Sequence, residues 1–379
     1  MRVMEIPVMD ISSAEMARTP PFAEEGMGAP QDGGQDGGPD GGRDGSMVME
    51  DAAGTRLLLS AEGEAGARAQ WRGSDPDAVR ALLLRALERV TAIRPAPTPL
   101  RLLGLDAADG VAPAVRDWLV AEGLAVPAGA GLDVFPGALW QRPELWLPMV
   151  RAPFPQRFAL TQGRRHPVRP AKPEGVVYAR HIPWLGARFE LRTVDIAADL
   201  PRFHRWMNDP RVAAIWDEAG DLAKHRAYLE GLQADPHLLP LMGAVNGVPF
   251  AYFELYWAKE NRIAPFYAAG DYDRGWHVLV GEDGFRGRAY VATWLPCLMH
   301  YMFLDDVRTT RIVGEPRADH HQQLRNLERS GFARVSTFEF PHKRAALVML
   351  TRERFFGDRL WVPDGTLPQV PERAPPTAI

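Results

Sequence analysis

Cysteine is almost absent from the 379-residue sequence, in which Cys297 is the single example. One cysteine excludes an intrachain disulfide and a zinc site built from several thiolates. An excess of positive charge is also lacking, because 44 Lys and Arg residues are balanced by 48 Asp and Glu residues, for a net charge of −4. This balance argues against nucleic acid or an anionic membrane surface as the main partner.

Long apolar segments are missing as well. No run approaches the ~18 apolar residues that a helix needs to cross a bilayer. The first residues, MRVMEIPVMDISSAEM, do not combine a basic start with an apolar core, so no signal peptide is evident. The protein is therefore expected to be cytoplasmic and to have no membrane span. Hydrophobic residues make up 46% and charged residues 24% of the chain, as is usual for soluble globular proteins.

Composition divides the chain into five parts. Residues 1–48 contain the run QDGGQDGGPDGGRDG, which has no apolar side chain to bury and predicts disorder. Residues 49–150 combine strand-like and helix-like patterns, which predict a small α/β accessory domain without a catalytic constellation. The proline-rich and arginine-rich residues 151–173 are expected to be a linker. The main domain is predicted over 174–357, followed by a tail over 358–379.

From residue 187 onwards the patterns indicate a mixed sheet wrapped by helices. Their order is β, α, α, β, β, β, α, β, α, β, β. Two of the strands are joined by Asn246-Gly247, a dipeptide typical of two-residue hairpin turns. Pro296 is expected to kink or interrupt the apolar helix in which it lies, and the neighbouring Cys297 is expected to be a buried, inert thiol.

Several segments of this region resemble a known enzyme family. They are FHRWMNDPRVAAIWDEAG, PFAYFELYWAKENRIAPFY, DYDRGWHVLVGEDGFRG, GEPRADHHQQLRNLERSGF and FPHKRAALVMLTRERFF. In this order they resemble the GNAT-fold acyltransferases of hydroxamate siderophore biosynthesis, both the aerobactin-type hydroxylysine acetyltransferases and the mycobactin-type lysine N-acyltransferase. The resemblance covers about residues 187–357. It implies a GNAT fold and acyl transfer to the hydroxylamine nitrogen of an N-hydroxylated lysine, ornithine or diamine.

The resemblance also implies the cofactor and where it binds. Acetyl-CoA or a longer acyl-CoA is expected between two separating central strands, with its pyrophosphate on the glycine-rich loop before a helix, where free N–H groups and the helix dipole favour an anion. No metal is expected. Gly284 and His320 depart from the Gln or Arg and the Asn that are usual at these two positions. The residues expected at the cofactor are Val280, Gly281, Gly284, Phe285, Arg286, Gly287, Arg288, Ala289 and His320.

His277 and Asp319 stand at the positions of the family's acting residues, in DRGWH and EPRAD. A hydroxylamine nitrogen is largely uncharged near neutral pH and must lose a proton as it attacks the thioester. Histidine, with a pKa near ~6.5, is suited to accept that proton. Asp319 is expected to orient His277, to receive the proton or to bind an ammonium group of the acceptor. The structural alternatives are an ordinary core or surface histidine and a helix N-cap aspartate.

Four more residues are candidates for contact with the acceptor: Trp216, Glu254, Trp257 and Lys259. Each has a structural alternative, because aromatic residues in strands are usually core residues and charged residues near turns are usually solvated. Two other functions also remain open. One is a GNAT acetyltransferase for an aminoglycoside or polyamine, and the other is a non-catalytic acyl-CoA-binding module. The acyl length, the acceptor and a homodimer formed through the accessory domain are left open.

Overall fold

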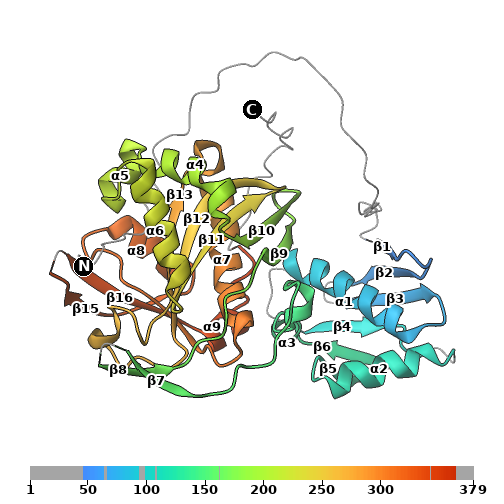
Figure 1. The fold of residues 1–379 in the computed structure, drawn as a ribbon. Coiled ribbons are helices and arrows are strands. Elements are labelled where there is room, and N and C mark those ends of the chain that lie inside the picture. Colours follow the sequence, from blue (N-terminus) through green and yellow to red (C-terminus); the bar gives the residue numbers. More distant parts are fainter. Residues whose placement is uncertain are drawn as a thin grey trace, which may run out of the picture. The chain divides into compact units, whose positions relative to one another are not determined.

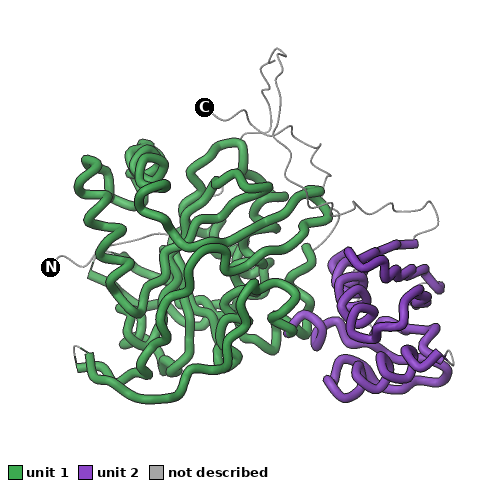
Figure 2. The backbone as a smooth tube through the Cα atoms, turned by 45° about the vertical axis from the view of Figure 1, so that its right-hand side comes forward, with its two compact units in different colours: residues 1–11, 142–379 green, residues 12–141 purple. Residues whose placement is uncertain are grey.

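The computed structural model describes residues 46–63, 66–93, 99–106, 109–161, 163–341 and 343–363. Most of the predicted disordered extension, 1–48, and of the predicted tail, 358–379, lies outside these ranges. Two compact units divide the chain between residues 141 and 142 (Figure 2). The domain boundaries predicted above stay a prediction.

The smaller unit, within residues 12–141, is an α/β unit. Its six-stranded sheet has the order β1-β2-β3-β4-β6-β5. The sequence pattern explains its longest helix, since Pro76 occupies the first turn and Val79, Leu83 and Leu87 recur on one buried face. The elements are β1 (Met47–Glu50), β2 (Arg56–Glu62), β3 (Gly66–Arg72), α1 (Pro76–Ile93), β4 (Leu100–Leu103), α2 (Val111–Ala121), β5 (Ala125–Ala128), β6 (Gly131–Val134) and α3 (Pro136–Leu139).

The larger unit contains an eight-stranded mixed sheet in the order β15-β16-β14-β13-β12-β11-β10-β9 (Figure 1). Among the described strands of this sheet, β13 and β14 pair in parallel and the other neighbours pair antiparallel. The elements are β7 (Phe158–Thr161), β8 (Arg164–Pro167), β9 (Val176–Ile182), β10 (Ala187–Thr193), α4 (Ile196–Met207), α5 (Pro210–Trp216), α6 (Leu222–Ala234), β11 (Leu238–Val245), β12 (Val248–Trp257), β13 (Arg274–Val280), α7 (Arg288–Asp305), β14 (Arg311–Gly314), α8 (His321–Arg329), β15 (Ala333–Glu339), β16 (Arg344–Thr351) and α9 (Arg352–Gly357).

The order predicted from residue 187 is confirmed, with differences in detail. Asn246 and Gly247 have φ of 47° and 77°, which is the turn expected between β11 and β12. The predicted order has two helices after its first strand, but the structure has three, α4, α5 and α6, because Asp209 caps α5 and Pro210 begins it. α7 runs through Pro296 without interruption. The last predicted strand ends at Thr351, whose hydroxyl caps α9.

Helices cover both faces of the sheet. On one face, a cluster of buried residues joins α4, α5 and α6 to Met242, Tyr252 and Leu279 of β11, β12 and β13. Side chains alternate along a strand, so Phe253 points to the opposite face, where its ring lies 5.8 Å from that of Trp294 in α7. No helix in the described part of the chain is both long and apolar enough to pass through a membrane.

The segment predicted as a linker, 151–173, contains the β7–β8 hairpin and is tied to the larger unit. Arg164 donates hydrogen bonds to the carbonyl oxygens of Glu260 and Asn261, at 2.7 and 2.6 Å. The guanidinium of Arg169 binds both carboxylate oxygens of Glu260, at 2.5 and 2.6 Å. These bonds hold the hairpin against the loop between β12 and β13.

Arg169→Ala should destabilise the protein by about 3–5 kcal/mol, because it leaves the buried Glu260 carboxylate without its bidentate partner. The matched control is Arg354→Ala, which breaks an exposed pair with Asp358 and should change stability by less than about 1 kcal/mol. Chemical denaturation of both variants measures the difference. Equal, small effects would mean that the hairpin is not held by this ion pair.

Candidate active site

The central strands β13 and β14 separate soon after they begin. Their register covers only Arg274–Ile312 and Gly275–Val313, although β13 continues to Val280. His277 lies two residues beyond the last paired position of β13, and Glu315 directly follows the end of β14. A histidine and a carboxylate are therefore placed where the two strands diverge.

His277 contacts a carboxylate with each ring nitrogen. Its Nδ1 lies 3.3 Å from Oε2 of Glu254, the residue directly opposite on β12. Its Nε2 lies 3.3 Å from Oε1 of Glu315. All three side chains are buried, with exposed fractions of 5%, 1% and 4% for His277, Glu254 and Glu315.

Tyrosine hydroxyls also donate hydrogen bonds to the two carboxylates. Tyr228 of α6 and Tyr252 of β12 donate to Oε1 of Glu254, at 2.5 and 2.9 Å. Tyr256 donates to Oε2 of Glu315 at 2.7 Å, and Arg262 lies 3.4 Å from Oε1 of Glu315. Each carboxylate thus has a hydrogen-bond donor besides His277, which partly compensates its removal from water.

Gly275 makes the contact of Tyr256 with Glu315 sterically feasible. It is the residue opposite Tyr256 on β13, and a Cβ atom there would overlap the Tyr256 ring. Because Gly275 has no side chain, the phenol can lie across β13 and reach the end of β14. The glycine two residues before His277 is therefore explained by packing inside the site.

The burial and the charges of the cluster act in opposite directions on the pKa of His277. Burial alone favours the neutral ring and lowers the pKa, but the hydrogen bonds and charges of Glu254 and Glu315 outweigh it, so the pKa is raised above 6.5. Burial likewise opposes ionisation of Glu315, yet the hydrogen bond and charge of His277 hold the pKa of this carboxyl well below its usual value. The cluster therefore favours a protonated His277 beside an ionised Glu315.

Asp319 lies outside this cluster of contacts. Its carboxylate is exposed and pairs with Arg317, at 3.2 and 3.1 Å, and this hydrogen bond lowers the pKa of Asp319. The helix N-cap is the next residue, His320, whose Nδ1 accepts the N–H of Gln323 at 3.1 Å. The hydrogen bonds that orient His277 in this structure come from Glu254 and Glu315, so an orienting role for Asp319 has no contact to support it.

The loop expected at the cofactor pyrophosphate lies between β13 and α7. Gly287 caps α7 with φ 99°, without a side-chain hydrogen bond, and a Cβ atom there would meet nothing within 4 Å. A different reason accounts for Gly281, because a Cβ there would overlap the ring of Trp206. Phe285 stacks on Phe250, with 5.1 Å between ring centroids, and Arg286 lies 2.9 Å from Asp283.

The other predicted contact residues have structural partners. Trp216 is fully buried in the cluster beneath α4, α5 and α6. Trp257 lies between two guanidinium groups, with Arg169 at 4.2 Å and Arg274 at 4.0 Å from its ring centroid. Lys259 donates to the carbonyl oxygen of Ala269 at 2.7 Å. Of the four acceptor candidates, Glu254 is the one that contacts His277.

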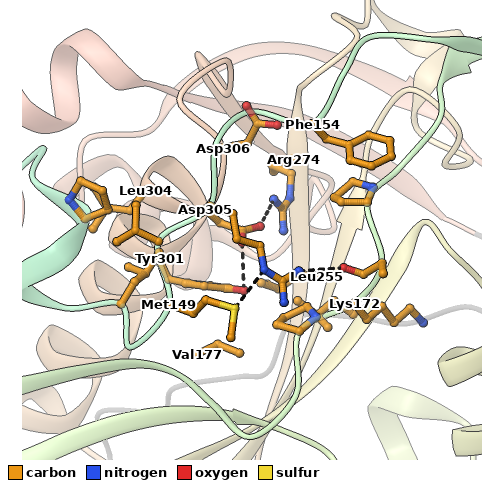
Figure 3. A pocket seen from close by; sticks show the side chains of 18 of the residues that line it. Met149, Phe154, Lys172, Val177, Leu255, Arg274, Tyr301, Leu304, Asp305 and Asp306 are labelled. Carbon is orange, nitrogen blue, oxygen red and sulfur yellow. Dashed lines mark hydrogen bonds and ion pairs between the residues drawn. The ribbon is translucent and has the colours of Figure 1, made fainter.

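A cavity of about 370 Å³ is lined by Leu255, Arg274 and Tyr301, among other residues (Figure 3). Its walls come from residues 143–177, the start of β11, the end of β12 and the end of α7. Leu255 and Trp257 line it, and strand alternation turns them away from the face on which Glu254 and Tyr256 meet His277. The ion pair Arg274–Asp305, at 2.8 Å, lies in its wall. The cavity is thus separate from the candidate active site.

Sequence analysis missed Glu315, Tyr228 and Tyr252. A signal for Glu315 was present, because it opens the same EPRAD segment from which Asp319 was chosen. The tyrosines occur among many aromatic residues and had no distinguishing pattern. Among the described residues, no group of three or more His, Cys, Asp or Glu side chains is arranged to hold a metal ion.

Comparisons with known proteins identify relatives of the larger unit. Residues 195–340 match the model of the acetyltransferase (GNAT) domain. The chain is 42% identical to the N(6)-hydroxylysine O-acetyltransferase of Escherichia coli over 221 residues, which are 58% of this chain and 70% of the relative. It is 43% identical over 235 residues to an N(5)-hydroxyornithine:cis-anhydromevalonyl coenzyme A-N(5)-transacylase of Beauveria bassiana, covering 61% of this chain and 51% of that protein.

Several relatives are considerably longer than the matched region. A hydroxyornithine transacylase of Ajellomyces capsulatus is 41% identical over 60% of this chain and 56% of its own length. The chain therefore spans about half the length of these fungal relatives.

Two solved structures are similar to part of this chain. An uncharacterized protein from Bacillus halodurans is 26% identical, with a TM-score of 0.46, over 50% of this chain and 96% of its own. An aminoglycoside acetyltransferase in complex with coenzyme A is 24% identical, with a TM-score of 0.40, over 44% of this chain and 96% of its own. The mixed sheet, the matched domain and the identity over 70% of the bacterial relative together show that the chain belongs to the GNAT acyltransferases of hydroxamate siderophore biosynthesis.

Proposed function

We propose that the protein transfers an acyl group from acyl-CoA to the hydroxylamine nitrogen of an N-hydroxylated lysine, ornithine or diamine. The observation that carries the proposal is the buried His277, bonded to two carboxylates where β13 and β14 separate. The names of the relatives support the acceptor class, since they specify hydroxylysine and hydroxyornithine.

Acyl-CoA would lie in the gap between β13 and β14, with its pyrophosphate at the N-terminus of α7. Helix N-termini attract anions through unpaired N–H groups and the helix dipole. The open space around the Cα of Gly287 supports this placement, because the backbone there can approach a phosphate. The residues proposed along the cofactor remain Val280, Gly281, Gly284, Phe285, Arg286, Gly287, Arg288, Ala289 and His320.

The reaction needs one proton to be removed from the acceptor. The hydroxylamine nitrogen attacks the thioester carbonyl, a C–N bond forms, the C–S bond breaks and CoA leaves as the thiolate, which is then protonated. His277 in its neutral form accepts the proton from nitrogen. Cys297 is buried in α7 and carries no acyl group in this direct transfer. Asp319, at the surface near the N-terminus of α8, is proposed to bind an ammonium group of the acceptor.

The acylated atom deserves a direct test, because the bacterial relative is named an O-acetyltransferase. Acylation on nitrogen yields a hydroxamate, which keeps a free N–OH group. Acylation on oxygen yields an ester that has lost that group. The two products differ in structure although their masses are equal.

A first prediction concerns the cofactor loop. Gly287→Ala should weaken CoA binding by about 1–3 kcal/mol, because φ 99° is unfavourable for alanine and the new methyl group would meet the phosphates. Calorimetric titration with CoA measures the loss. Gly357→Ala, at the end of α9 with nothing within 4 Å of its Cβ, is the control and should leave CoA binding unchanged. If a folded Gly287→Ala protein binds CoA as tightly as the wild type, the loop is not part of the cofactor site.

A second prediction concerns the acceptor. With acetyl-CoA, N-hydroxylysine, N-hydroxyornithine and N-hydroxycadaverine should be compared with the same amines lacking the hydroxyl group, by following thiol release. At least one hydroxylated compound should react much faster than its parent, because its nitrogen is uncharged near neutral pH. NMR of the product should show acylation on nitrogen.

Other outcomes identify the alternatives. Equal rates with parent amines or with polyamines would indicate a general GNAT acetyltransferase. CoA binding without release of the CoA thiol in the presence of any tested acceptor would indicate a binding module. A burst of free CoA without acceptor, lost in Cys297→Ala, would replace direct transfer by an acyl-cysteine intermediate.

A further inference from the structure

We infer that Glu254 and Glu315 are the positioning residues of His277, one for each ring nitrogen, and that Asp319 does not have this role. The inference deepens the proposed function, because it assigns the groups that set the orientation and protonation of the proposed base. It starts from two contacts of 3.3 Å, Nδ1 to Glu254 and Nε2 to Glu315.

The protonation state follows from the donor count. A neutral imidazole has one N–H group, so it can donate to only one of two flanking carboxylates, and its other nitrogen would turn a lone pair toward a carboxylate oxygen. An imidazolium donates at both nitrogens. The resting geometry therefore fits a doubly donating imidazolium, which must lose one proton before it can act as a base.

The two carboxylates are not equivalent. Glu254 faces His277 across the regular β12–β13 ladder, so the sheet register fixes its position. Glu315 follows the last residue of β14, where the strands no longer pair. The Nε2 side of His277 thus faces the gap in which the thioester is proposed to lie. Glu254 keeps the Nδ1 proton in place, and Nε2 is the nitrogen that exchanges a proton during the reaction.

Stability alone does not account for this arrangement. Two buried carboxylates and a buried histidine cost desolvation energy, and replacing such groups by apolar residues is often neutral or stabilising. Here the chain supplies three tyrosine hydroxyls and Arg262 to hold them. The arrangement of so many buried polar groups around one imidazole points to a role of that imidazole in the reaction.

The experiment compares Glu315→Gln and Glu254→Gln with the wild type. The matched control is Glu218→Gln, which changes a buried glutamate that pairs with Lys224 at 3.0 Å. Two properties are measured: the pH dependence of kcat/KM, and the titration of the His277 ring by NMR in the free protein. The signal is assigned as the one that His277→Gln removes.

In the wild type, the activity limb and the NMR titration should both lie at higher pH than for an ordinary histidine. Glu315→Gln removes one negative charge but leaves the ring buried, so both should move to lower pH. Its kcat should fall about tenfold to a thousandfold, with little change in the acceptor KM. Glu254→Gln should shift the titration in the same direction. Glu315→Asp, which keeps the charge, should keep the limb near its wild-type position, and Glu218→Gln should leave it unchanged.

Three outcomes would overturn the inference: an unchanged His277 titration in both Gln variants, an equal shift in Glu218→Gln, or a rise in acceptor KM with an unchanged pH limb in Glu315→Gln. The last would make Glu315 a substrate-binding group. The NMR measurement needs no substrate, so it separates the two proposals. A protein without acyl transfer whose His277 titration still depends on Glu315 refutes the proposed function alone.

Discussion

Burial of the charged cluster around His277 is the constraint on which the site depends. Ionised groups removed from water must be compensated by opposite charges and hydrogen bonds. The compensating groups come from four different elements: Tyr228 from α6, Tyr252 and Tyr256 from β12, His277 itself from β13, and Glu315 from the end of β14. Each element must therefore hold its place in the sheet or above it, and the same contacts that satisfy the charges define the chemistry available at the imidazole.

The separation of β13 from β14 gives this cluster an open side. Pairing stops after Gly275, so His277 and Glu315 lie at the margin of the gap instead of inside a continuous ladder. Gly275 also has a steric role, since its missing side chain leaves room for the Tyr256 ring. Beyond β13, Gly287 caps the start of α7, the helix N-terminus at which the CoA pyrophosphate is proposed to bind. A single strand and its two ends thus connect the proposed base to the proposed cofactor loop.

Residues 151–173 illustrate how a local pattern can mislead. Their prolines and arginines predicted a solvated linker. In the structure, Arg164 and Arg169 bind the loop after β12. Neighbouring residues line a cavity on the sheet face opposite His277. The guanidinium groups have a buried partner in Glu260, which lies about ninety positions further along the chain. Local composition carries no information on a partner at that distance.

Sequence by itself determined the features that depend on neighbouring residues. The strand and helix order from residue 187 and the Asn246-Gly247 turn were predicted because periodicity and turn chemistry act over a few residues. The glycine-rich start of α7 was expected from the family resemblance. His277 was selected through the family resemblance, and Glu254 was one of the four candidates for contact with the acceptor. Tertiary structure alone decided that Glu254 and Glu315, and not Asp319, contact His277, because that choice depends on strand register and on residues from 228 to 315 that only the folded sheet brings together.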